Sequence, residues 1–229
     1  MTSSLTIGGA AVPVKLRRST RAQRISLRVD PQDRAVVLVL PGHVPPAQGM
    51  AFARSQTDWL AARLAALPAA IPFVDGMVLS LLGTDHPVHH CPEDRGGVWI
   101  EGGRILVSGR PEHFSRRLSD WLKRQARAEI TTRALPMAAT INRTAGRISL
   151  RDPRSRWGSC TSRGDLAFSW RLILAPASVM DYVVAHEVAH LAEMNHSPVF
   201  WRTVRRLVAD IEGPRRWLRQ NGSELHRYG

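Results

Sequence analysis

The stretch Val183-Val184-Ala185-His186-Glu187-Val188-Ala189-His190 decides how this sequence of 229 residues is interpreted. It contains the pattern H-E-x-x-H. Between Pro176 and this pattern, apolar residues recur at helical spacing, and the first turn of a helix tolerates the proline ring. A spacing of four residues on a helix places both imidazoles on one face, about 40° apart. The stretch therefore predicts a helix whose two histidines can bind one metal ion.

A third ligand is needed, because a catalytic zinc site keeps three protein ligands and one open position. His196 and Glu193 are the candidates. If the helix continued, Glu193 would lie about 10 Å and His196 about 15 Å from His186 along the axis, too far to share an ion. Asn195 tolerates the left-handed conformation that ends helices, and Ser197-Pro198 can open a new helix. We therefore expect a turn that folds His196 back to the motif and leaves Glu193 beside the site or in solvent.

These residues predict a hydrolase of the zincin type with one Zn²⁺ as cofactor. The metal ligands would be His186, His190 and His196, and the zinc would polarise the scissile carbonyl. Glu187 would be the catalytic residue, acting as general base on the zinc-bound water. An edge strand over Trp157–Cys160 would hold an extended peptide by main-chain hydrogen bonds.

The segments before the motif predict an α+β fold with a zincin-like catalytic region over residues 109–229. A long helix is expected from Pro111, interrupted by Pro136. Three short apolar segments at Ile148–Leu150, Arg156–Cys160 and Leu166–Leu174 predict a small antiparallel sheet that precedes the motif helix.

Residues 1–108 predict a β-rich region with one helix. A hairpin is expected around Asp30-Pro31-Gln32-Asp33, and apolar residues at helical spacing predict the helix from Pro46 to Leu67. Glycine-punctuated apolar runs from Pro72 to Val107 predict further strands, and we place the boundary between the regions near Gly109. The sequence shows no internal repeat.

Composition limits the partners and the location. A net charge of +13 and a pI near 11.4 predict attraction to polyanions such as nucleic acid, nucleotides or anionic lipid. The two cysteines, Cys91 and Cys160, lie far apart, which argues against a disulfide framework and for a reducing compartment. The stretch Leu5–Val14 lacks the features of a signal peptide, and Leu64–Val74 is too short for a membrane span. We expect a cytoplasmic protein without a membrane segment.

Four blocks in order carry a resemblance to a known family. They are Arg156-Trp157-Gly158-Ser159-Cys160, Phe168-Ser169-Trp170-Arg171-Leu172, the motif at residues 186–190, and Asn195-His196-Ser197-Pro198-Val199-Phe200-Trp201. With these blocks the sequence resembles the YgjP-like metallopeptidases over about residues 22–225. The resemblance implies zinc on the three histidines named above, with Glu187 as the catalytic residue. Position 193 is Glu where the metzincin pattern has Gly, so no metzincin turn is expected.

The resemblance leaves two alternatives to a zinc metallopeptidase that acts on peptides or proteins. The family is similar to SprT-like and Wss1-like proteases, which act on proteins crosslinked to DNA, so a basic nucleic-acid-associated protease or binding protein is one alternative. A relative has been described as a nucleoside triphosphate pyrophosphatase, so metal-dependent hydrolysis of UTP is the other. The peptidase is preferred because one Lewis-acid zinc with a glutamate base suits a carbonyl, and the sequence has no Gly-rich phosphate loop.

Other residues near the motif, or of metal-binding type, have simpler interpretations. Tyr182 can donate to an oxyanion but is more often a packing residue, and Cys160 is more simply a small buried residue than a reactive thiol. The tryptophans at 157, 170 and 201 are expected to form the core under the site. Strand alternation separates neighbouring histidines in the group His86, His89, His90 and Cys91, so no second metal site is expected. A solvated helix face is favoured over a phosphate site for the arginines Arg202, Arg205, Arg206, Arg215, Arg216 and Arg219.

Overall fold

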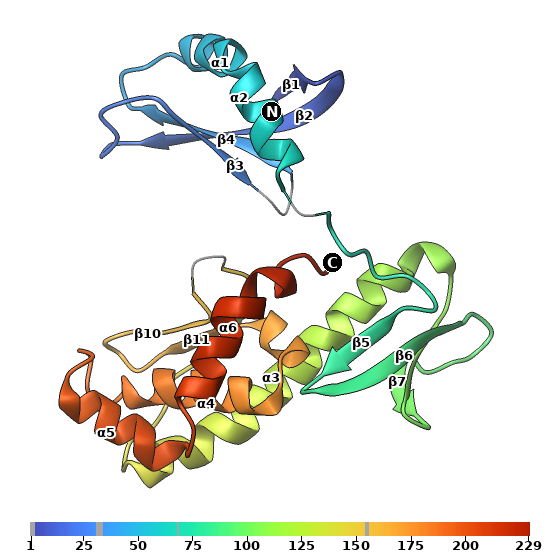
Figure 1. Ribbon diagram of the computed structural model, residues 1–229, viewed down its shortest axis with the longest axis vertical. Helices are drawn as coiled ribbons and strands as arrows, with labels where there is room; N and C mark the ends of the chain where they lie inside the picture. Colours follow the sequence, from blue (N-terminus) through green and yellow to red (C-terminus); the bar gives the residue numbers. More distant parts are fainter. Residues whose placement is uncertain (1–2, 31–33, 68, 154–155) are drawn as a thin grey trace. The chain divides into compact units, whose positions relative to one another are not determined.

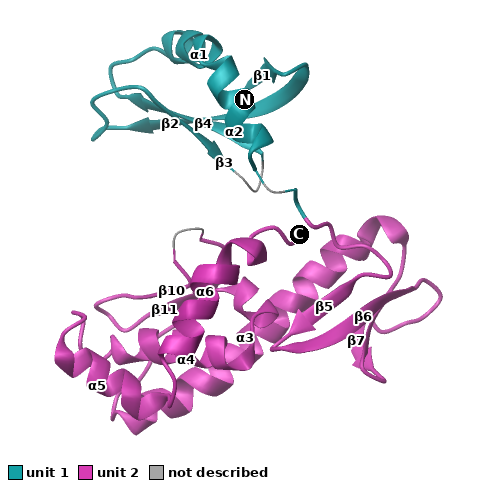
Figure 2. Ribbon diagram, viewed as in Figure 1, with its two compact units in different colours: residues 1–70 teal, residues 71–229 magenta. Residues whose placement is uncertain are grey.

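The chain forms two compact units, residues 1–70 and residues 71–229, in a computed structural model that describes residues 3–30, 34–67, 69–153 and 156–229 (Figures 1 and 2). The boundary expected near Gly109 lies inside the second unit. The physical reason is that apolar side chains from 73 to 107, among them Leu79 and Ile105, are buried in one hydrophobic core with the helices that follow.

The first unit is a four-stranded sheet covered by two helices. Its elements are β1 (Ser3–Ile7), β2 (Ala10–Ser19), β3 (Ser26–Asp30), β4 (Ala35–Pro41), α1 (Pro46–Ser55) and α2 (Thr57–Ala65). The order across the sheet is β1-β2-β4-β3, with β2 and β4 parallel and the outer pairs antiparallel. The predicted hairpin is confirmed by the antiparallel pairing of β3 and β4, while its tip at 31–33 lies outside the described residues. The single helix predicted here is divided at Gln56.

Close packing joins α1 to the central strand of this sheet. Gly49 is buried in α1, and a Cβ atom at this position would collide with the side chain of Leu40 and lie 3.1 Å from Leu38. Both leucines belong to β4 and are fully buried. A glycine at this position therefore lets the helix backbone approach the strand.

The second unit begins with a sheet of the same topology. Its strands are β5 (Val78–Leu81), β6 (Thr84–Cys91), β7 (Val98–Glu101) and β8 (Arg104–Ser108). Their order is β5-β6-β8-β7, again with a parallel central pair and antiparallel outer pairs. The sheets β1–β4 and β5–β8 thus have the same topology although the sequence shows no repeat. This is possible because strand pairing depends on apolar alternation and turn positions rather than on residue identity.

A long helix, α3 (Phe114–Thr140), follows this sheet after the short 3₁₀ helix η1 (Pro111–His113). The expected interruption at Pro136 is wrong, since α3 continues through it for one further turn. Proline removes one backbone hydrogen bond, at a cost of about 3 kcal/mol in a helix interior. Here the neighbouring Ala134 and Ala138 are buried, so packing of the last turns against the core offsets that loss.

A three-stranded sheet comes next, made of β9 (Ile148–Arg151), β10 (Gly158–Cys160) and β11 (Leu166–Ser169) in the order β10-β11-β9. β10 and β11 pair antiparallel, as expected, but β9 pairs parallel to β11, which corrects the prediction of a wholly antiparallel sheet. The chain reaches β11 by way of β10 on its far side, and this detour permits the parallel pairing. β10 lies at the edge of the sheet, where the edge strand was predicted.

The remaining elements are helical and complete the mixed α+β fold. They are the 3₁₀ helix η2 (Trp170–Leu174), α4 (Ala177–Ala189), α5 (Pro198–Leu207) and α6 (Glu212–Leu225). The buried Arg171 of η2 joins these elements to the sheet, because its guanidinium donates to both carboxylate oxygens of Asp152, at 2.8 and 3.1 Å. It also donates to the carbonyl oxygens of Leu225 and Tyr228, which fixes the end of α6. Over the residues described, no helix has both the length and the apolar character to cross a bilayer.

Candidate metal centre

Helix α4 positions the motif residues. Most of its side chains are buried, including Val183, Val184 and Val188, so the helix is apolar on nearly every side and lies within the core. Glu187 is only 7% exposed in this apolar setting, while His186 and His190 are partly exposed. Packing on several sides therefore fixes the helix that carries both motif histidines.

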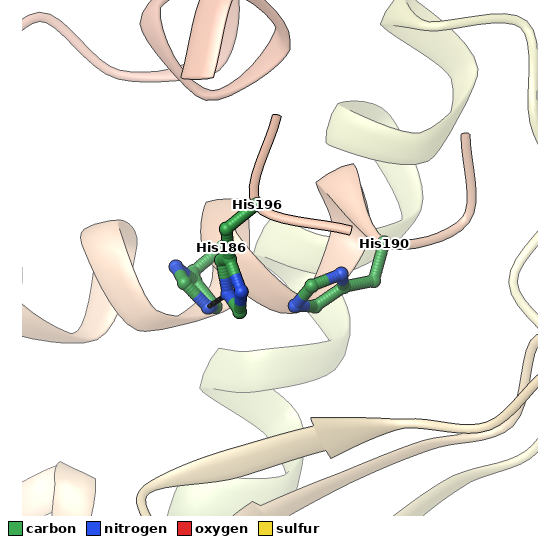
Figure 3. A group of neighbouring side chains, drawn as sticks. All are labelled: His186, His190 and His196. Carbon is green, nitrogen blue, oxygen red and sulfur yellow. Dashed lines mark hydrogen bonds between the residues drawn. The ribbon is translucent and has the colours of Figure 1, made fainter. Parts of the chain in front are cut away.

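The structure brings His196 to the motif histidines. The imidazole nitrogens of His186, His190 and His196 that could bind a metal all lie within 4.8 Å of one another, and the rings converge in Figure 3. Nε2 of His186 and Nε2 of His196 are 3.0 Å apart. Two nitrogens bound to one tetrahedral zinc lie about 3.3 Å apart, given bonds of about 2.0–2.1 Å. The donor type and the spacing therefore fit a single metal ion.

The turn that returns His196 begins earlier than expected. The helix ends at Ala189, and tight backbone hydrogen bonds from Ala192 and Glu193 to the carbonyl oxygen of Ala189 close its end. The backbone of Asn195, which lies among the described residues, does not have a positive φ. The prediction of a left-handed conformation at this residue is therefore wrong. The new helix was predicted correctly, since the Ser197 side chain accepts a hydrogen bond from the Phe200 backbone N–H and caps α5.

Two contacts orient the histidine rings. Nδ1 of His190 lies 3.0 Å from the carbonyl oxygen of Glu193, so a proton on Nδ1 can be donated there and the Nε2 lone pair is left for a metal. Glu193 thus contacts His190 through its backbone carbonyl, while its carboxylate accepts a hydrogen bond from the backbone N–H of Asn195, at 3.3 Å. The ring of Phe200, fully buried, lies 4.5 to 4.9 Å from the rings of all three histidines, measured between centroids, and forms an apolar wall beside them.

The environment lowers the pKa values of the two motif histidines. Burial, together with the neighbouring histidines and Arg215, lowers the pKa of His186 to about 4. Burial also lowers the pKa of His190, against the opposing effect of its hydrogen bond to Glu193. Because a metal binds the neutral imidazole, little deprotonation of His186 is needed at neutral pH.

Glu187 is held against the edge strand. A Cβ atom added at Gly158 of β10 would lie 2.5 Å from Cγ of Glu187 and 2.7 Å from its Oε1. Only a residue without a side chain leaves room for the glutamate here. Burial raises the pKa of Glu187 to about 7, although the positive charge of Arg156 opposes that rise. The carboxyl group can therefore exchange protons near neutral pH.

A pocket of about 650 Å³ opens over these groups. Strand β10 forms part of its wall, and Tyr182 and Met194 line it together with the three histidines and Glu187. It also receives three arginine side chains, from Arg156, Arg215 and Arg219. The pocket thus combines an edge strand, a cluster of metal-type ligands and a buried carboxyl group.

Comparison with known proteins assigns the chain to a family. A family model described as YgjP-like, metallopeptidase domain, matches residues 23–221. The chain belongs to the YgjP-like metallopeptidase family. The chain is similar to a solved structure described as the metallopeptidase zymogen of Pyrococcus abyssi abylysin, with 20% identity and a TM-score of 0.32 over 48% of this chain and 96% of that chain. No curated protein matches the chain.

Cys160 and the histidines at positions 86 and 90 were the other candidate reactive or metal-binding residues of this YgjP-like chain. Cys160 lines the pocket, but burial, with contributions from Glu187 and Asp165, raises its pKa to about 11, so its thiol is protonated at neutral pH. His86 and His90 lie within hydrogen-bonding distance of backbone carbonyl oxygens, and in the described part of the chain the cluster at 186, 190 and 196 is the group that can hold a metal.

Sequence reasoning missed several residues in or beside the pocket of this YgjP-like chain. Arg215 and Arg219 line the pocket, although a solvated face was favoured for them. Gly158 and Phe200 stand in the blocks that carried the family resemblance, which is the signal that could have singled them out. Their contacts with Glu187 and the histidines come from other elements, so spacing along the chain does not reveal them.

Proposed function

We propose that this metallopeptidase is zinc-dependent, with His186, His190 and His196 as ligands of one zinc ion and Glu187 as general base. The observation that carries the proposal is the convergence of three imidazole nitrogens within 4.8 Å beside a buried glutamate. Three imidazoles and an open position suit zinc, and closed structural sites have four protein ligands instead. The family assignment supports the same chemistry.

The residues of the chain would divide the work of peptide hydrolysis. When bound, zinc supplies Lewis acidity, which polarises a carbonyl group and lowers the pKa of water. A carboxylate oxygen of Glu187 takes the proton of the attacking water and delivers it to the leaving amine nitrogen. In the metal-free protein burial raises the pKa of this carboxyl group to about 7, which suits a group that first takes a proton and then gives it up. β10, at the sheet edge, offers main-chain groups to an extended substrate.

The two cysteines support a proposal for the cellular location. Cys91 and Cys160 are both free thiols in the structure. Unpaired thiols suit a reducing compartment, so we propose that the enzyme acts in the cytoplasm. Localisation of a tagged protein by fractionation tests this proposal, and recovery outside the cytoplasm would contradict it.

Metal content and hydrolysis together test the function. Wild type and Glu187→Ala should each bind about one zinc, because Glu187 is not a ligand, whereas His196→Ala should lose it. Of these three proteins, only the zinc-loaded wild type should cleave casein. His43→Ala, which changes an exposed histidine of the first unit, is the matched control and should retain both metal and activity.

Two results would overturn the proposal. The first is a wild-type protein that binds no metal even when zinc is supplied. The second is hydrolysis of UTP but not of casein, abolished by Glu187→Ala, which would assign the same site to a nucleotide pyrophosphatase.

A further inference from the structure

The pocket beside the three histidines is strongly cationic. Arg156 precedes β10, while Arg215 and Arg219 lie four residues apart on α6, a spacing that places both on one face of the helix. Glu187 is the single carboxylate among the residues that line the pocket. Since Glu187 is assigned to proton transfer, no other carboxylate of the pocket lining neutralises these arginines.

The three arginines of the pocket differ in their contacts. Arg215 donates to Glu212 at 2.9 Å, and its guanidinium lies 5.4 Å from the centre of the Trp201 ring. In the part of the chain that the structure describes, neither Arg156 nor Arg219 forms an ion pair with a carboxylate. Both are exposed at the pocket, so their guanidinium groups can bind an incoming anion.

These charges lie close to the reacting groups. Arg215 lies over the ring of Trp201, and the centre of that ring is 5.9 Å from the ring of His186 and 6.0 Å from that of His196. Arg156 lies two residues before Gly158, the residue packed against the Glu187 side chain. An anion bound by these arginines would therefore lie in the same pocket as the histidines and Glu187 rather than at a remote surface. A guanidinium group binds a carboxylate through two parallel hydrogen bonds, which gives both strength and orientation.

We propose that the arginines select peptides with an aspartate or glutamate next to the scissile bond. This inference rests on the proposed peptidase function, since it names the substrate class of the same site. A peptide ligand is favoured over a nucleoside triphosphate because an edge strand, β10, lines the same pocket and can pair with an extended main chain. The sequence also lacks a Gly-rich phosphate loop.

Paired peptides test the selection. The zinc-loaded enzyme is given quenched fluorogenic peptides that differ only in Asp against Asn, or Glu against Gln, at the positions flanking one cleavable bond. We expect kcat/KM to be roughly 10- to 100-fold higher for the acidic member, the range for a charge-assisted hydrogen bond. Binding of the same peptides to the zinc-loaded Glu187→Gln variant, followed by fluorescence anisotropy, should show the same preference without turnover.

Arginine variants assign the preference to the pocket. Arg156→Gln and Arg219→Gln should each reduce the ratio of acidic to neutral peptide, and Arg219→Glu should shift the preference toward peptides with lysine. Arg216→Gln is the matched control, because Arg216 lies on the same helix but outside the pocket. Zinc content of each variant shows that the metal site is intact.

Failure of this inference is distinct from failure of the proposed function. If acidic and neutral peptides are bound and cleaved equally, the selection is overturned while the peptidase function stands. If no peptide is cleaved but UTP is, and the arginine variants lose that activity, both are overturned and the arginines bind phosphate.

Discussion

Strands β1–β4 and strands β5–β8 share one order and one set of pairing directions, yet the two sheets serve different purposes. In the first unit the helices α1 and α2 cover the sheet and close a core that includes Leu38 and Leu60. In the second unit the helix that follows, α3, contacts both the sheet and α4, the helix that carries His186 and Glu187. The first sheet therefore packs against helices of its own unit, whereas the second sheet is connected to the site through α3. This helix can connect them because one of its sides packs on the sheet and another packs on α4.

Matched core substitutions give the largest expected effect. Leu38 in β4 and Ile105 in β8 are both fully buried on the central pairs of their sheets. Changing either to alanine should destabilise its own unit by about 2–5 kcal/mol. Ile105→Ala should also lower the temperature at which zinc is released, because Ile105 shares a core with α4. Calorimetry with a fluorescent zinc indicator measures both, and equal zinc release from both variants would contradict the separation of the two cores.

Two closely packed glycines, one in each unit, extend the comparison. Gly158→Ala should lower kcat by about 100-fold, because the new methyl group displaces the Glu187 carboxylate by a fraction of an ångström or more. Zinc content should stay near that of wild type. Steady-state kinetics with a cleavable peptide provides the measurement, and unchanged kcat would show that Gly158 does not position the glutamate.

Gly49→Ala is the counterpart in the first unit. Overpacking against Leu40 costs about 1–3 kcal/mol, and the better helix propensity of alanine returns about 1 kcal/mol. We expect a small loss of stability and full peptidase activity. Denaturant unfolding and the same peptide assay check this result, and loss of activity would link the first unit to catalysis.

The pH dependence of stability concerns the second unit alone. Among the described residues, the buried charged side chains are Arg171 and Glu187, both in the second unit. Because the folded pKa of Glu187 is raised from 4.5 to about 7, the penalty for burying it is absent below about pH 4.5 and complete above about pH 7. The metal-free wild type should thus lose stability relative to Glu187→Gln as pH rises through this window.

Denaturant unfolding of the two metal-free proteins between pH 4.5 and 8 measures this difference. Comparing the two proteins cancels the opposite effect of His186, whose lowered pKa costs stability as pH falls below about 6.5. A difference that does not change with pH would show that Glu187 is ionised throughout.

The sequence by itself determined the features that depend on neighbours along the chain. The family followed from four sequence blocks, while the mixed α+β fold and the motif helix followed from apolar spacing. Ser197 and Pro198 predicted the start of α5, because a cap and its helix lie within a few residues of each other. The expected ligands at 186, 190 and 196 form the one group found among the described residues that can hold a metal.

Tertiary structure decided what depends on contacts between distant segments. The continuation of α3 through Pro136, the parallel pairing of β9 and the division at residue 70 all reflect burial that no local pattern records. The pocket likewise unites β10 with α6, so the space for Glu187 beside Gly158 and the three arginines becomes visible only after folding. Backbone propensity acts over a few residues, whereas packing joins residues that are far apart in the chain and can override it.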